Sequence, residues 1–276
     1  MEMTLENTLS NNITSENDKT SYDNACKRLL ANKIILAWIM KSCLKEYKDC
    51  SIKDIMEQYI EGEPEIATVA VHPDETNRET GESTYGMSNK GNTVTEGTAE
   101  YDIRFFAIAP LSGERIQLII NIENEYNFNQ EDSIVKQAIC SGLQMISEQY
   151  GTVFIEPHYE KIQKVCSIVV CLNPPKDRKN NINEYLIEEE RIMGAVKETG
   201  QDYDLLTAIV IYLGKETDEN YFGILKLLDT LLSSEIKLEV KKQILQEEYD
   251  ITITTEIESE LISISMYNFS DEIEQK

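Results

Sequence analysis

Two long apolar runs constrain the fold of this chain more than any other feature of its sequence. Residues 165–172 and 205–213 consist almost entirely of Val, Ile, Leu, Ala and Cys. Apolar runs of this length without polar alternation are typical of strands buried on both faces of a helix-covered parallel sheet. Residues 131–150 have apolar side chains at helical spacing and are followed by Gly151, a residue that commonly ends helices. They predict a helical crossover before the first run. The sequence therefore predicts an α/β fold.

A β-hairpin is predicted before this crossover. Residues 101–109 and 115–125 are strand candidates separated by a Pro-Leu-Ser-Gly cluster, which is typical of a turn. The apolar residues of both strands alternate onto one face. If Ser112 and Gly113 form a two-residue turn, Asp102 lies directly opposite Glu123. A hairpin beside parallel strands predicts a mixed central sheet flanked by helices.

The rest of the chain divides into three parts. Residues 1–22 are polar and are expected to form a flexible tail. The α/β domain is predicted over 23–213 and an acidic helical extension over 214–276. Further helices are expected at 23–47, 51–60, 221–232 and 235–249, a strand at 66–71 and a long polar loop at 73–98.

The composition bears on location and partners. Fifty acidic residues against 26 basic ones give a formal net charge of −24, which opposes binding to nucleic acid. No run reaches about 18 consecutive apolar residues and the first twenty residues lack an apolar signal region, so a cytoplasmic protein without a membrane partner is expected. Its six cysteines are scattered through apolar runs and are expected to be reduced thiols.

Three acidic residues of the predicted hairpin form the candidate catalytic group. Asp102 lies on the first strand, and Glu123 and Glu125 lie two residues apart on the second. Carboxylates held in register across two strands have Cβ atoms about 4.5 to 5.5 Å apart and repel one another unless a cation neutralises them. Mg²⁺ or Mn²⁺ is the expected cofactor, because hard cations prefer carboxylate and phosphate oxygens. The alternative is a solvated acidic face without a metal.

Ordered stretches across about residues 23–250 add a family resemblance. They include CKRLLANKIILAWIMKSC, YIEGEPEIATVAVHPDET, YDIRFFAIAP, IINIENE, HYEKIQKV, LNPPK and ILKLLDTLLSSEI. In these stretches the chain resembles the PD-(D/E)XK nuclease-family transposases, the recombination-promoting nuclease group of bacteria.

This resemblance implies a restriction-endonuclease-like core over 23–213. Asp102 and Glu123 match its metal-binding acidic positions, and Glu125 matches its third motif position. Relatives carry Lys or Gln at that position to orient or activate the attacking water, so Glu125 departs from the pattern. Glu65, at the edge of the strand before the hairpin, is a further candidate metal ligand.

The expected function is metal-dependent endonucleolytic hydrolysis of DNA phosphodiester bonds. The candidate DNA contacts are Lys136, Lys161, Lys164, Lys176, Arg178 and Lys179. A solvated loop is the alternative for this basic zone. Two alternatives for the whole chain remain open: a catalytically silent nuclease-fold protein that binds a protein, a nucleotide or a small ligand, and an acidic mimic of DNA. A homodimer is also left open.

Overall fold

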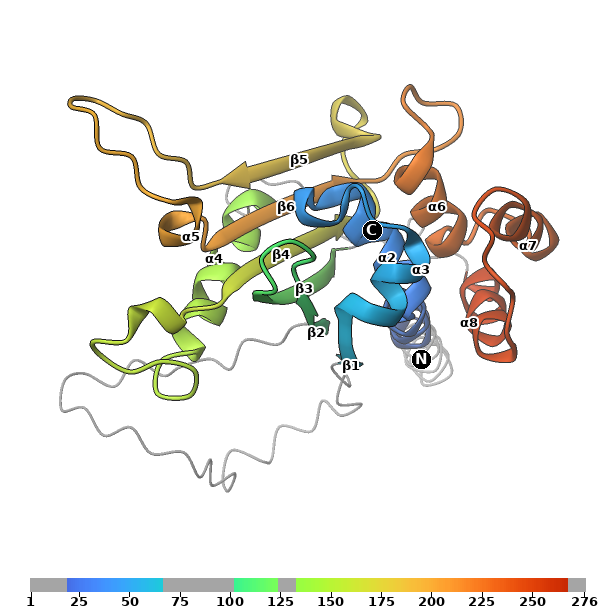
Figure 1. Cartoon of the computed structure of the whole chain (residues 1–276). Helices are drawn as coiled ribbons and strands as arrows, with labels where there is room; N and C mark the ends of the chain where they lie inside the picture. Colours follow the sequence, from blue (N-terminus) through green and yellow to red (C-terminus); the bar gives the residue numbers. More distant parts are fainter. Residues whose placement is uncertain (1–18, 67–101, 124–132, 268–276) are drawn as a thin grey trace, which may run out of the picture.

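The computed structural model describes residues 19–66, 102–123 and 133–267 (Figure 1). Its centre is a six-stranded sheet with the order β1-β2-β3-β4-β6-β5. The strands are β1 (Ile60–Ile66), β2 (Ile103–Ile108), β3 (Arg115–Glu123), β4 (Lys164–Cys171), β5 (Asn181–Leu186) and β6 (Leu206–Tyr212).

The sheet is mixed, as the sequence predicts. β1, β2 and β3 form an antiparallel meander, β3, β4 and β6 are mutually parallel, and β5 closes the far edge antiparallel to β6. The crossover from β3 to β4 contains α4 (Ile134–Glu148). β4 and β6 are the two apolar runs, and both are buried along nearly their whole length. The α/β class with a mixed sheet flanked by helices is therefore confirmed.

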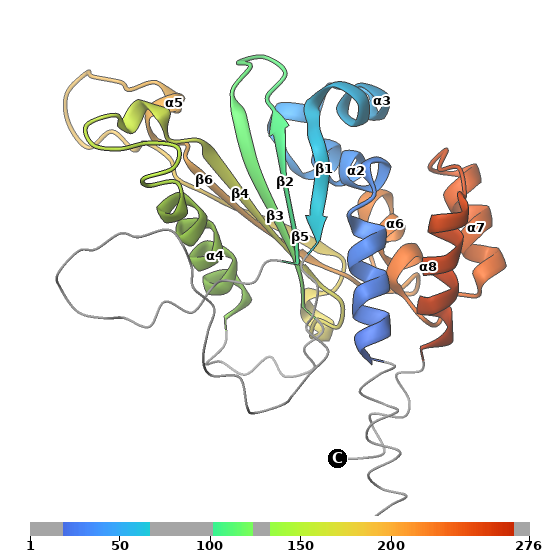
Figure 2. The same cartoon turned by 90° about the horizontal axis from the view of Figure 1, so that it is seen from below.

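Helices cover both faces of the sheet (Figure 2). α4 packs on one face, against side chains that include Val169, Ala208 and Val210. The helical segment 19–30 and α2 (Lys33–Cys43) lie on the other face, with α6 (Gly223–Leu232), α7 (Leu238–Glu247) and α8 (Thr255–Met266). The remaining short elements are η1 (Lys45–Tyr47), α3 (Ile52–Asp54), the π-helical η2 (Ile55–Tyr59), η3 (Tyr159–Lys161), η4 (Lys176–Arg178) and α5 (Gly200–Tyr203).

The C-terminal helices belong to the main core. Leu228 and Leu231 of α6 and Leu261 of α8 share one buried cluster with Ile209 and Ile211 of β6. The described part of the predicted extension, residues 214–267, is therefore mainly helical, but it supplies one layer of the same hydrophobic core.

Three local predictions need correction. The helix expected over 23–47 is two helices, because Asn32 accepts a hydrogen bond from Ile34 N and caps a new start. The boundary expected after residue 22 is also wrong, since Tyr22 is buried and donates to the carbonyl of Leu232 at 2.8 Å. The helix expected at 51–60 ends at Tyr59, and Ile60 already belongs to β1.

Candidate active site

The turn between β2 and β3 sets the register of the acidic residues. Ala109 N–H donates to the carbonyl of Glu114 at 2.8 Å, and Gly113 N–H donates to the carbonyl of Ala109 at 2.9 Å. The loop therefore comprises four residues, 110–113, instead of the predicted two. Gly113 has a φ of 71°, in the left-handed region that glycine adopts without strain.

This loop shifts the pairing of the predicted site residues. Ile103 pairs with Ile120, and continuing the register by one residue places Asp102 opposite Asn121. Asp102 N–H donates to Asn121 Oδ1 at 3.2 Å, in agreement with that placement. The prediction that Asp102 lies directly opposite Glu123 is wrong by two residues. Because side-chain direction repeats every two residues, the shift leaves every side chain on its predicted face.

Asp102 and Glu123 are therefore diagonal neighbours across the strand pair. Such residues lie about 7–8 Å apart, which long side chains bridge. Both emerge at the same end of the hairpin, where β3 reaches its last described residue. Two carboxylates converge on one end of the sheet, but at a wider spacing than direct pairing gives.

Both oxygens of Asp102 have donors within the protein. Lys27 of the helical segment 19–30 places its Nζ 2.6 Å from Oδ1. Ile122 N–H donates to Oδ2 at 2.7 Å. Lys27 is only 8% exposed, so its ammonium is largely withdrawn from water. Attraction to the carboxylate offsets part of the cost of burying that charge.

Glu123 is held from the next helix. Its Oε1 accepts a hydrogen bond from Nε2 of Gln137 in the first turns of α4. Its backbone carbonyl accepts from Leu172 N–H, just beyond β4, at 2.9 Å. Glu123 is therefore fixed between α4 and the end of β4.

The site thus joins four elements. Lys27 comes from the N-terminal helix, Asp102 precedes β2, Glu123 ends β3 and Gln137 comes from α4. The sequence did not identify Lys27. A lysine beside an apolar helical stripe gives the same local pattern whether its ammonium group is buried against a carboxylate or lies in water. Gln137 lies on the helix that follows the acidic motif, but nothing in the sequence identifies Glu123 as its hydrogen-bond partner.

The donor chemistry at this end of the sheet suits a hard divalent cation. Asp102 and Glu123 offer carboxylate oxygens, the ligands that Mg²⁺ and Mn²⁺ prefer. Glu125 lies outside the described residues. Within 19–66, 102–123 and 133–267, no three His, Cys, Asp or Glu side chains gather closely enough to hold a metal ion. Glu65 is exposed on β1 in register with Arg104 and belongs to no such group.

Four of the predicted DNA contacts lie at the end of the sheet that holds Asp102 and Glu123, called the carboxylate end below. Lys136 is exposed in the first turn of α4, next to Gln137. Lys176, Arg178 and Lys179 follow β4, whose last residue Cys171 pairs with Glu123. Arg178 lies 5.9 Å from the ring centroid of Tyr212, and Lys179 lies 3.6 Å from Asp218.

The other two predicted contacts lie at the opposite end. Lys164 pairs with Ile116 at the start of the parallel strands, and Lys161 precedes it in η3. The Lys164 ammonium lies 2.8 Å from both Glu46 and Asp204. Burial favours its neutral form, but hydrogen bonds with Asp204 and Glu46 outweigh burial and raise its pKa. The predicted basic zone is therefore split between the two ends of the sheet.

Comparisons with known proteins give no match: no family model, no curated protein and no solved structure resembles this chain closely enough to count. None of the helices in the described part of the chain combines the length and apolar character needed to cross a bilayer.

Proposed function

We propose that this chain is a nuclease-fold protein with a restriction-endonuclease-like core. The order of elements supports this assignment: a helix, an antiparallel three-strand meander, a helical crossover and a parallel strand. The acidic residues emerge from the end of the meander, as the resemblance to the PD-(D/E)XK transposases implies.

Within that class we propose a metal-dependent DNA endonuclease of the transposase-associated type. The observation that carries the proposal is the ammonium of Lys27, which lies 2.6 Å from Asp102. Glu125 stands where relatives carry Lys or Gln, so that position supplies no positive charge. Lys27 supplies a positive charge from the N-terminal helix instead, and its ammonium contacts the carboxylate of Asp102.

Each residue of the site has a chemical role in this reaction. Asp102 and Glu123 would hold Mg²⁺ or Mn²⁺, which lowers the pKa of a bound water and neutralises charge on phosphate oxygens. Lys27 orients the attacking water and stabilises negative charge that develops on the phosphate. Gln137 is a positioning residue, because its amide fixes the direction of Glu123.

The contacts with DNA must overcome the net charge of −24. Of the predicted cationic contacts, four lie at the carboxylate end of the sheet with Asp102 and Glu123: Lys136, Lys176, Arg178 and Lys179. Their small number predicts weak binding that falls steeply with salt, because each phosphate contact releases counterions.

A plasmid-cleavage assay tests this function. Purified full-length protein is incubated with supercoiled DNA and Mg²⁺ or Mn²⁺, while calorimetry measures binding of the metal. Asp102→Asn and Glu123→Gln should abolish cleavage and weaken metal binding, and Lys27→Met should abolish cleavage while metal binding persists. Lys33→Met is the matched control, since Lys33 lies six residues away and pairs with the exposed Glu63. Cleavage that survives Asp102→Asn would refute the assignment.

The second candidate is a catalytically silent nuclease-fold protein that binds a ligand or partner. It is favoured by the contacts that Lys27 and the Ile122 N–H make with both oxygens of Asp102. In that case Lys27 replaces the metal ion permanently. Neither cleavage nor metal binding would then occur in the wild type, and Lys27→Met would create metal binding by freeing the carboxylate.

A further inference from the structure

A cavity lies beside the candidate site, at the carboxyl ends of β4 and β6. Its volume is about 530 Å³, within the range of about 300–1,000 Å³ typical of small-ligand pockets. Leu172 forms part of its wall and also donates its backbone N–H to Glu123. Ligands of open α/β sheets bind beyond the carboxyl ends of the strands.

The cavity has an apolar wall and a polar rim. The apolar wall includes Leu172, Pro174, Leu213 and Leu232. Flat aromatic groups such as nucleobases bury well against side chains of this kind.

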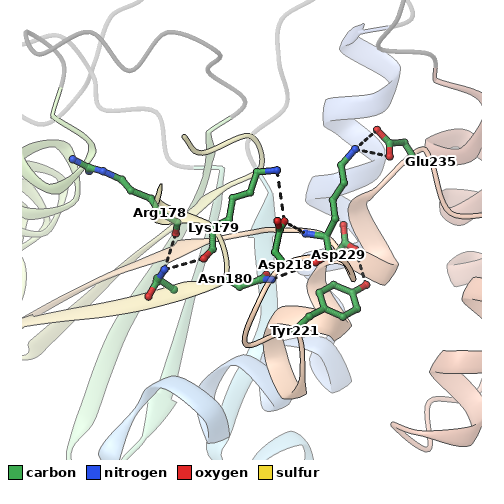
Figure 3. A network of polar contacts seen from close by, with 9 residues as sticks. Arg178, Lys179, Asn180, Asp218, Tyr221, Asp229 and Glu235 are labelled. Carbon is green, nitrogen blue, oxygen red and sulfur yellow. Dashed lines mark hydrogen bonds and ion pairs between the residues drawn. The ribbon is translucent and has the colours of Figure 1, made fainter. Parts of the chain in front are cut away.

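Two lysines stand on the rim, shown in part in Figure 3. Lys179 lies 3.6 Å from Asp218, and Lys215 lies 2.6 Å from Glu235. Lys215 and Glu235 are more than half exposed. Exposed ion pairs contribute little free energy, so the Lys215 ammonium is able to exchange Glu235 for a phosphate at small cost, whereas the Lys179–Asp218 pair is only about a quarter exposed.

A carboxyl group lines the cavity on the side of α6. Tyr221 donates to Oδ2 of Asp229 at 2.6 Å, which fixes the direction of the group (Figure 3). Burial raises the pKa of Asp229 above its ordinary value. A half-buried carboxyl group of this kind is suited to a directional hydrogen bond with the edge of a base.

We propose that this cavity binds a single deoxynucleotide, with the base on the apolar wall against Asp229 and the phosphate at Lys179 and Lys215. The site goes beyond the proposed hydrolysis, because none of these residues belongs to the Lys27–Asp102–Glu123 group. It places one nucleotide next to the residues that would cleave the strand.

Calorimetry of the full chain in metal-free buffer tests this site without relying on hydrolysis. The probes are dAMP, deoxyadenosine and inorganic phosphate. Only dAMP engages both the apolar wall and the lysines, so it should bind at least about tenfold more tightly than either fragment. Equal affinity for dAMP and phosphate, or no saturable binding of dAMP at millimolar concentration, would overturn the proposal.

Variants locate the binding. Lys179→Ala and Lys215→Ala should each weaken dAMP about tenfold and leave deoxyadenosine unchanged. Glu235→Ala should strengthen dAMP binding, because it releases Lys215. Lys176→Ala is the matched control outside the cavity, and Glu123→Gln separates this site from the nuclease site. A loss with Lys176→Ala as large as that with Lys179→Ala would show non-specific charge attraction and contradict the assignment.

Discussion

The two ends of the central sheet both hold lysine–carboxylate contacts, but they differ in the groups that contact the carboxylates. At the end where the parallel strands begin, Lys45 and Lys164 meet Glu46 and Asp204, so two cations face two carboxylates. At the end where these strands finish, Lys27 faces Asp102, and Glu123 has an amide partner in Gln137.

We interpret the ion pairs at the first end as structural, and the group at the second end as the candidate functional site. In the first cluster both carboxylates are contacted by ammonium groups, and these ion pairs link η1, β4 and the segment before β6. The other end combines the carboxylates of Asp102 and Glu123 with an ammonium and an amide that come from two different helices. Polar groups that several elements bring together beside a cavity make this end the candidate functional site.

The largest expected effect is on catalysis. Lys27→Met should reduce plasmid cleavage about a thousandfold, because charge stabilisation or proton transfer by one group contributes about 10²- to 10⁴-fold. Lys164→Met should leave the rate per folded molecule unchanged. Rates normalised to the folded fraction distinguish the two ends, and an equal loss in both variants would break the comparison.

Stability should show the opposite order. Lys164→Met removes this cation from Glu46, while Asp204 keeps Lys45, and should lower the free energy of unfolding by about 3 kcal/mol, the lower end of the cost of breaking a buried pair. Lys27→Met should cost less, about 1–2 kcal/mol, since Asp102 keeps its bond from Ile122 N–H. Urea denaturation at neutral pH measures both, and a larger loss for Lys27→Met would show that its ion pair serves the fold.

A third lysine sharpens the comparison by lacking a carboxylate contact. Lys241 is fully buried, and its Nζ donates to the carbonyl of Leu231 at 3.0 Å. No carboxylate of the described residues lies within ion-pair distance of it, and burial lowers its pKa to about 8.

Its effect on stability depends on pH in a defined direction. Between about pH 8 and 10.5 the unfolded chain keeps the Lys241 proton while the folded chain loses it, so this group makes stability rise with pH. Below pH 8 both states are charged and the fold bears the full cost, about 3 kcal/mol. Lys241→Met should therefore stabilise most at pH 7 and progressively less by pH 9 in guanidinium denaturation. A gain independent of pH would contradict the buried charge.

The smallest expected effect concerns Gln137. Gln137→Ala should weaken metal binding about tenfold, because partners of ligating carboxylates typically contribute 10- to 100-fold. Gln137→Glu should weaken it further by repelling Glu123. Unchanged metal affinity in both variants would remove Gln137 from the site.

The local sequence pattern was sufficient to predict the strands and helices that bury one or both of their faces. The runs that became β4 and β6, the alternation of β2 and β3 and the spacing of α4 all agree with the structure to within a few residues. α8 carried a readable signal, since Ile257, Leu261 and Ile264 repeat at helical spacing after the N-cap Thr254. Its acidic composition concealed that stripe.

β5 gave little signal in the sequence. It is an edge strand whose residues are mostly exposed, so it lacks an alternating apolar face. Its hydrogen bonds with β6 define it, and those depend on chain segments about 25 residues apart coming together.

The sequence by itself determined the α/β class and the faces of the hairpin, because burial periodicity is a local property, and Asp102 and Glu123 remain its prediction for the site. Only the tertiary structure decided the register across the hairpin, the division of the lysines between two ends of the sheet and the approach of Lys27 to Asp102. Those features depend on loop geometry and on contacts between segments 75 residues apart, which no local pattern records.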